Sequence, residues 1–259
     1  MDYLHRIEKI NADSILWNVP EQKQGVVNVV GGNMQNFRTP TRVAEYLGAN
    51  YPLKTVNLVL PDILRNKLPL LDNFVFLDST ESGSFSNGEE ITDTLNAADY
   101  NLLVGDFSKN NITAKAIQDA CKNATKPTLV TRDTVDLIAV AGAERILMNP
   151  NLVIFGSMVQ LQKLFRAIYY PKMLMMSQSL IQVAEIMHKF TLSYPVAIIT
   201  LHDGQILIAQ NGTVNVVPLE KTHYLPLTLW SGELASRIVA LNLYNPNNFL
   251  EATTAALKN

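Results

Sequence analysis

Residues 26–33 read Val-Val-Asn-Val-Val-Gly-Gly-Asn, a β-branched run that ends in two glycines and an asparagine. β-Branched side chains favour a buried strand, and glycines directly after it let the backbone approach a ligand closely. In an open α/β sheet, ligands bind beyond the carboxyl ends of the strands. We therefore expect Gly32 and Asn33 to lie on a ligand-binding edge, and the alternative is a plain strand-to-helix turn.

Similar apolar runs recur along the first part of the chain and alternate with stretches of helical spacing. This alternation is typical of a mostly parallel sheet covered by helices. The runs that we predict as strands are 26–30, 55–60, 74–77, 101–104, 128–131 and 146–148. The predicted helices include 40–47, 112–121, 135–140 and a segment over 180–187.

The pattern changes after residue 195 to short strands joined by tight turns. Runs at 196–200, 206–209 and 214–217 are separated by Asp-Gly and Asn-Gly turns, which predicts an antiparallel meander at one edge of the sheet. Two helices, 231–243 and 246–257, follow, the second with Asn245 as its cap and Pro246 in its first turn. No repeat or linker composition interrupts the chain, so we expect one domain over residues 1–259.

Composition excludes several classes of function. The 23 acidic and 21 basic residues give a net charge of -2, which does not favour nucleic acid or an anionic membrane as a partner. Cys121 is the only cysteine, and the four histidines lack the spacing of a metal site, so we expect neither a disulfide nor a protein-bound metal. Neither a signal peptide nor a spanning segment is recognisable, and we expect a cytoplasmic protein.

A carboxylate follows the predicted strand at 128–131. Asp133 would lie on the same ligand-binding edge as Gly32, where it could hold a sugar hydroxyl, a metal or water. A helix N-cap is the alternative, because aspartate is favoured at that position and 135–140 has a helical pattern.

The turn at 228–233 reads Thr-Leu-Trp-Ser-Gly-Glu and precedes a helical pattern. Backbone N–H groups at a helix N-terminus bind phosphate oxygens, and a carboxylate in the first turn could act there as a general base or acid. The alternatives are that Ser231 is an ordinary cap and that the helix dipole alone favours Glu233. Trp230 could stack on a base or fill the place of a ligand.

Taken in order, these segments resemble the ribokinase-like superfamily, in particular the ADP- or ATP-dependent NAD(P)H-hydrate dehydratases. Residues 22–33 are similar to the family's opening K-G and first strand ending in G-G-S, and residues 129–139 to its V-L-D-A-D-A-L-N-L-I-A segment. Residues 146–151 are similar to I-L-T-P-H, one residue longer, and residues 228–235 to T-G-G-S-G-D-V-L.

The resemblance implies a three-layer αβα fold, ADP or ATP with Mg²⁺ as cofactor, hydrated NADH or NADPH as substrate, and an assembly of several subunits. It makes Glu233 the catalytic base. The residues it places at the nucleotide phosphates are Thr228, Ser231 and Gly232, and those it places near the substrate are Gly32, Asn33, Asp133 and Asn151.

The differences from the family fall on its chemistry. Leu229 and Trp230 replace the two leading glycines of the phosphate-binding turn, Glu233 replaces aspartate, and Asn151 replaces histidine. Three functions follow as hypotheses: an NAD(P)H-hydrate dehydratase, a non-catalytic relative that binds a nucleotide or a partner protein, and a small-molecule kinase of the same fold.

Overall fold

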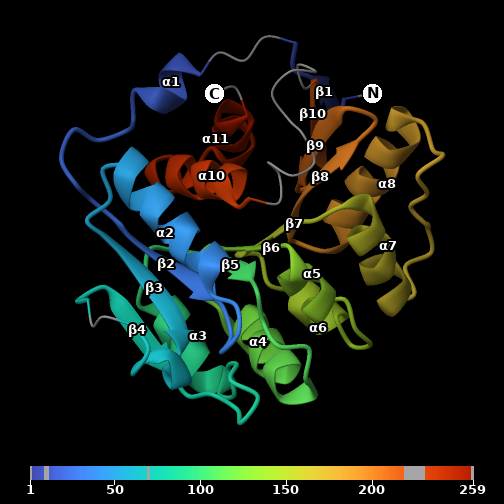
Figure 1. Cartoon of the computed structure of the whole chain (residues 1–259). Coiled ribbons are helices and arrows are strands. Elements are labelled where there is room, and N and C mark those ends of the chain that lie inside the picture. The colour runs from blue at the N-terminus through green and yellow to red at the C-terminus, as the bar shows by residue number, and fades with distance from the viewer. Residues whose placement is uncertain (1, 9–11, 69–70, 219–230, 258–259) are drawn as a thin grey trace.

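The computed structural model describes residues 2–8, 12–68, 71–218 and 231–257. Its centre is a ten-stranded sheet with the order β1-β10-β9-β8-β7-β6-β5-β2-β3-β4 (Figure 1). The strands are β1 (Leu4–Arg6), β2 (Val26–Gly31), β3 (Thr55–Pro61), β4 (Phe74–Leu77), β5 (Tyr100–Gly105), β6 (Thr128–Thr131), β7 (Leu152–Phe155), β8 (Ala197–His202), β9 (Gln205–Gln210) and β10 (Thr213–Pro218).

Strands β2 to β8 pair in parallel, whereas β8, β9 and β10 form an antiparallel meander. The prediction of a mostly parallel sheet with a C-terminal meander is confirmed. The short N-terminal strand β1, which was not predicted, adds to the edge of the meander by pairing in parallel with β10.

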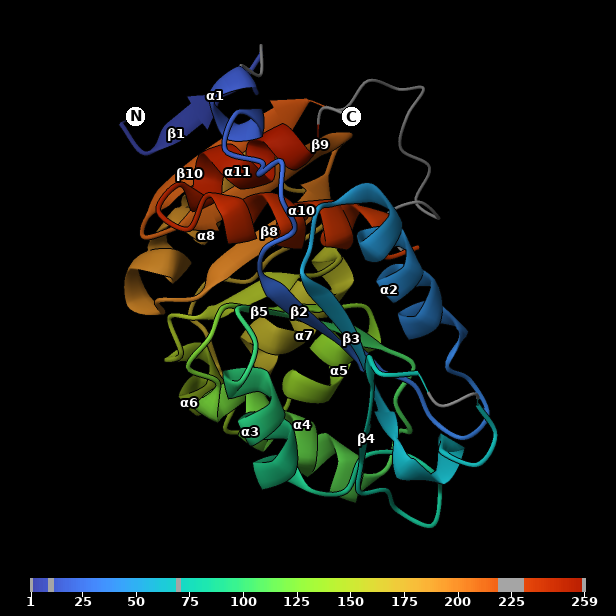
Figure 2. The ribbon, with the colours of Figure 1, turned by 90° about the vertical axis from the view of Figure 1, so that its left-hand side faces the viewer.

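Helices cover both faces of the sheet. They are α1 (Asp13–Leu16), α2 (Arg38–Asn50), α3 (Gly88–Asn96), α4 (Asn111–Asn123), α5 (Asp133–Ile138), α6 (Glu144–Leu147), α7 (Met158–Ala167), α8 (Leu180–Ser193), α10 (Glu233–Tyr244) and α11 (Phe249–Ala256), with a 3₁₀ turn η1 (Asp62–Leu64). Helices α2, α10 and α11 pack on one face of the sheet and α3 to α8 on the other (Figures 1 and 2). Each face has one apolar core between the sheet and its helices. None of the helices in the described ranges is long and apolar enough to cross a bilayer.

Two predictions about local structure are wrong. Residues 146–148 are not a strand, because Ile146 and Leu147 lie in α6 and face the core from there; the strand is β7, a few residues later. A short apolar run cannot distinguish a buried helical turn from a strand. Likewise Asn245 does not cap the last helix: it donates to Leu241 O at 2.9 Å and so closes α10.

A row of polar side chains crosses the sheet near the amino ends of its central strands. Asn57 donates to Asn28 Oδ1 at 2.9 Å, Asn28 to Asn101 Oδ1 at 3.2 Å, and Asn101 to Thr128 Oγ1 at 3.3 Å. Each pair is also in register between neighbouring strands. Since buried amides need partners, this row fixes the register of β3, β2, β5 and β6, and with it the positions at which these strands end.

Candidate functional site

The loops that follow β2 and β5 lie against each other at the carboxyl edge of the sheet. Gly32 N–H donates to Gly105 O at 2.9 Å, and a Cβ on Gly31 would lie 2.5 Å from the same oxygen. Gly32 also has a φ of +92°, which side chains disfavour. Glycine is therefore required at 31 by the close approach of Gly105 at the end of β5, and at 32 by the backbone conformation, and the pair places Asn33 on this edge.

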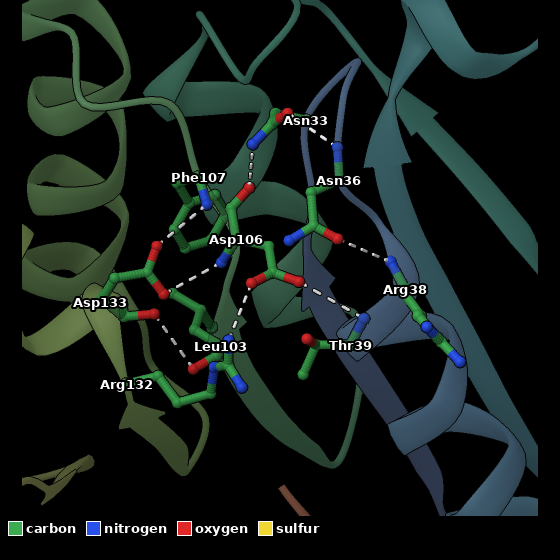
Figure 3. A network of polar contacts seen from close by, with 10 residues as sticks. Asn33, Asn36, Arg38, Thr39, Leu103, Asp106, Phe107, Arg132 and Asp133 are labelled. Atoms are coloured by element: carbon green, nitrogen blue, oxygen red, sulfur yellow. Dashed lines mark hydrogen bonds and ion pairs between the residues drawn. The ribbon is translucent and has the colours of Figure 1, made fainter. Parts of the chain in front are cut away.

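Asp133, the first residue of α5, holds the loop after β5. Its carboxylate accepts the backbone N–H groups of Asp106 at 3.0 Å and of Phe107 at 3.2 Å (Figure 3). A Cβ on Gly105 would collide with the carboxylate, so glycine is needed there. Burial raises the pKa of the Asp133 carboxyl, and the backbone donor of Asp106 opposes that rise. The N-cap of α5 is Arg132, so the cap interpretation of Asp133 is wrong.

Asp106 and Arg132, at the ends of β5 and β6, form a partly buried ion pair. The Arg132 guanidinium lies 2.9 Å from Asp106 Oδ1, and their side chains are 24% and 5% exposed. Both residues have positive φ angles, 57° and 60°, a backbone conformation that costs on the order of 1 kcal/mol or more for a non-glycine residue. Such strain persists only where the surroundings fix it, and here the ion pair joins two neighbouring strand ends.

Asp106 also connects this edge to α2 and to Asn33. Its second carboxylate oxygen accepts the Thr39 N–H at 3.4 Å, in the first turn of α2, and its carbonyl accepts Asn33 Nδ2 at 2.6 Å (Figure 3). Asn33 Oδ1 in turn accepts the N–H groups of Gln35 and Asn36. The structure thus brings Gly32, Asn33 and Asp133 together around Asp106, on the edge where ligands bind in parallel α/β sheets.

The start of α10 lies on the same edge. Gly232 has a φ of +89°, and a Cβ there would overlap Val43 of α2, so the two helices meet at a position that only glycine fits. Ser231 Oγ accepts the Glu233 N–H at 3.3 Å. The Glu233 carboxylate lies 3.4 Å from the Arg42 guanidinium, in a pair whose side chains are 42% and 56% exposed. Thr228, Leu229 and Trp230 lie outside the described residues.

Helices α2 and α10 run side by side in the same direction. Arg42 pairs with Glu233, and one turn further along Arg237 Nε donates to the Tyr46 hydroxyl at 3.1 Å. Both N-termini therefore point to the same place, and each carries roughly half a positive elementary charge. This arrangement suits an anion that binds between the ends of β2, β5 and β6 and the starts of the two helices.

Asn151 is not part of this arrangement. It precedes β7, and its carbonyl accepts the Thr128 N–H at 2.8 Å at the beginning of β6. It therefore lies at the amino edge of the sheet, opposite Gly32, Asn33 and Asp133. The misplaced strand at 146–148 explains the difference, since Asn151 starts a strand and does not follow one.

Sequence reasoning missed four residues of the edge: Asp106, Arg132, Thr39 and Arg42. The Gly105-Asp106 pair directly after a buried strand, and Arg132 directly before Asp133, are signals of the kind that could have found the first two. In the described ranges no cluster of three His, Cys, Asp or Glu side chains could hold a metal ion.

Comparison with known proteins shows what this fold is similar to. No protein-family model matches the chain, and no curated protein sequence matches it. Among solved structures, a hypothetical protein from Streptococcus mutans matches with a TM-score of 0.64 and 13% identity, over 96% of this chain and 87% of that one. A ribokinase-like superfamily protein from Enterococcus faecalis has a TM-score of 0.64 and 12% identity, with coverage of 99% and 87%.

A fructokinase with bound ATP from Xylella fastidiosa matches with a TM-score of 0.55 and 9% identity, over 89% of each chain. At these identities the likeness establishes the fold, which is ribokinase-like with a three-layer αβα arrangement.

Proposed function

We propose that this chain binds ADP or ATP at the carboxyl edge of its sheet and transfers the terminal phosphate to a hydroxyl group, with Glu233 as the general base. The observation that carries the proposal is the position of Glu233. It lies in the first turn of α10, directly after a glycine at positive φ, where two helix N-termini meet beside the strand ends. Helix N-termini stabilise phosphate, and an adjacent carboxylate can accept the proton of an attacking hydroxyl.

The ion pair with Arg42 leaves Glu233 available for this role. Both side chains are about half exposed and 3.4 Å apart, and exposed pairs of this kind contribute at most about 1 kcal/mol. A substrate hydroxyl can therefore displace Arg42 from the carboxylate.

The nucleotide would bring its own divalent cation. Mg²⁺ is commonly held by nucleotide phosphates and water with only one or two carboxylates from the protein. An enzyme that takes up Mg²⁺ together with ADP or ATP therefore needs no cluster of three such ligands, and the described residues contain none. Ser231 and Gly232, at the start of α10, are the described residues that we assign to the phosphates.

The preferred acceptor is hydrated NADH or NADPH, as the family resemblance implies. Its ring hydroxyl would attack the terminal phosphorus, and AMP (from ADP) or ADP (from ATP) would leave. The bond between the ring carbon and the phosphorylated oxygen would then break, and inorganic phosphate would depart. Loss of a proton from the neighbouring carbon restores the double bond of the nicotinamide. Gly32, Asn33 and Asp133 lie on the edge where this acceptor would bind.

A small-molecule kinase is the second candidate, because the fructokinase with bound ATP has the same fold. It would use Glu233 in the same way, but the phosphate would stay on the product. A protein that binds nucleotide or a partner without turnover is the third candidate, and Leu229 and Trp230 in place of glycine favour it.

One set of assays separates these candidates. Hydrated NADH is incubated with the protein, Mg²⁺ and ADP or ATP, and the recovery of NADH absorbance is followed; recovery above the blank supports the dehydratase. Transfer of label from ATP to sugars, vitamins or hydroxymethylpyrimidines without that recovery supports the kinase. A thermal shift with nucleotide but no turnover supports the binding protein, since a ligand of the folded state raises its stability. The proposal would be overturned if the protein shows no turnover with any of these acceptors and no thermal shift with any nucleotide.

A further inference from the structure

Two arginines and two helix N-termini lie around the starts of α2 and α10. Arg132 is matched by Asp106, and Arg42 is matched by Glu233. The N-terminus of α10 carries roughly half a positive elementary charge, and Arg42 lies beside it, in contact with Glu233 of the first turn. An anion bound at this N-terminus would therefore lie next to the Arg42 guanidinium.

Arg42 is the cation best placed to bind such an anion, because its side chain can change partner. Its side chain is 56% exposed, and its contact with Glu233 is a single one at 3.4 Å. Arg132, by contrast, is held at 2.9 Å by a carboxylate that is only 5% exposed. A guanidinium offers several N–H donors that match phosphate oxygens in pairs, so phosphate can replace a single exposed carboxylate contact.

We propose that the Arg42 guanidinium binds the terminal phosphate of the nucleotide. In the absence of nucleotide the same guanidinium pairs with the Glu233 carboxylate, and the phosphate replaces that carboxylate when the nucleotide binds. This inference rests on the proposed function. Contacts on either side of Arg42 fix its helix: the Thr39 N–H is bonded to Asp106, and Val43 packs on Gly232. The backbone of Arg42 thus stays in place while its side chain exchanges one partner for the other. The exchange releases the Glu233 carboxylate to accept the proton of the substrate hydroxyl.

The competition between carboxylate and phosphate gives the two residues opposite effects on binding. Loss of Arg42 removes donors from the phosphate, whereas loss of the Glu233 charge frees Arg42 and removes repulsion between two anions. General destabilisation of the site would weaken binding in both variants.

The test is calorimetric titration of the full chain with Mg²⁺·ATP and with pyrophosphate, without any acceptor. The variants are Arg42→Ala, Arg42→Lys and Glu233→Gln. Lys189→Ala is the matched control, since Lys189 forms an equally exposed pair with Glu185 on α8, outside the proposed site. Urea unfolding of each variant shows that it is folded.

We expect Arg42→Ala to weaken ATP binding by about tenfold or more, which corresponds to about 1.4 kcal/mol. Arg42→Lys should fall between it and the wild type, Glu233→Gln should bind severalfold more tightly than the wild type, and Lys189→Ala should be unchanged. Unchanged binding in Arg42→Ala, weaker binding in Glu233→Gln, or no binding by the wild type would overturn the inference. If this binding pattern holds but the wild type has no turnover, the proposed function fails and the role of Arg42 stands.

Discussion

The carboxylate of Glu233 lies 3.4 Å from the guanidinium of Arg42, although 191 positions separate the two residues in the chain. Their helices begin at the same edge of the sheet, beside the ends of the strands that carry Asp106 and Arg132. This relationship is what turns an ordinary first-turn glutamate into a candidate catalytic group.

Gly232 should be intolerant of any side chain. Gly232→Ala places a Cβ at a φ of +89° and against Val43, so we expect a loss of about 1–3 kcal/mol in the free energy of unfolding. Gly204→Ala is the matched control, because Gly204 also has a positive φ, +68°, but no atom lies within 4 Å of its added Cβ. Urea unfolding that gives equal losses for the two variants would show that the contact between α2 and α10 is not tight.

The asparagine row across the sheet should contribute strongly to stability. Asn101→Leu removes the donor to Leu95 O and to Thr128 and leaves the Asn28 amide without one acceptor, all within the buried sheet. We expect the free energy of unfolding to fall by about 2–4 kcal/mol. The comparison is Asn123→Ala, at the exposed end of α4, for which a fall below about 0.5 kcal/mol is expected. Equal small effects would mean that the register of the sheet does not depend on this row.

Stability should depend on pH through Asp133. Because burial raises the pKa of this carboxyl in the folded state, the folded protein binds its proton more tightly than the unfolded chain does. Its contribution to stability is therefore greatest below about pH 4, near the ordinary aspartate value, and falls as the pH rises through the raised folded pKa.

Asp133→Asn removes this titration. The difference in unfolding free energy between the wild type and Asp133→Asn should shift against the wild type as the pH rises above about 4, measured by urea unfolding across a pH series. A difference that is constant with pH would contradict the assignment.

Cys121 should be inert in the native protein. It is fully buried, and burial raises the pKa of its thiol to about 12, so almost no thiolate is present at mildly alkaline pH. We expect a thiol reagent to react with it only in denaturant. Fast labelling of the native protein would show that α4 opens readily from the sheet.

Much of the fold follows from local patterns in the sequence. Buried parallel strands are β-branched runs bounded by turn residues, and Gly31 and Gly32 mark a close backbone approach. Most of the strands, the meander and the position of the loop after β2 were therefore predictable, but β1 and β7 were not. Local pattern fails where an apolar run is short: Ile146 and Leu147 are buried in α6, a result that only the packing of the neighbouring strand β7 decides.

The site was predictable only in part, because its contacts join residues that are far apart in sequence. Asp133 was expected on the ligand-binding edge, but its contact with the backbone of Asp106 depends on the pairing of β5 with β6. The sequence of α2 predicts which of its residues are buried, but not what an exposed residue such as Arg42 contacts. The contact of Arg42 with Glu233 depends on the parallel packing of α2 on α10.

Turnover by Glu233→Gln, compared with the wild type, tests the central claim most directly. Both proteins are assayed with Mg²⁺, ADP or ATP and the acceptor on which the wild type is active, and Glu185→Gln, which removes an exposed ion-paired carboxylate on α8, is the control. The account predicts that kcat falls by about a hundredfold or more in Glu233→Gln while nucleotide binding is kept, because a general base contributes a factor of that order. Glu185→Gln should match the wild type. Wild-type kcat in Glu233→Gln would contradict the account.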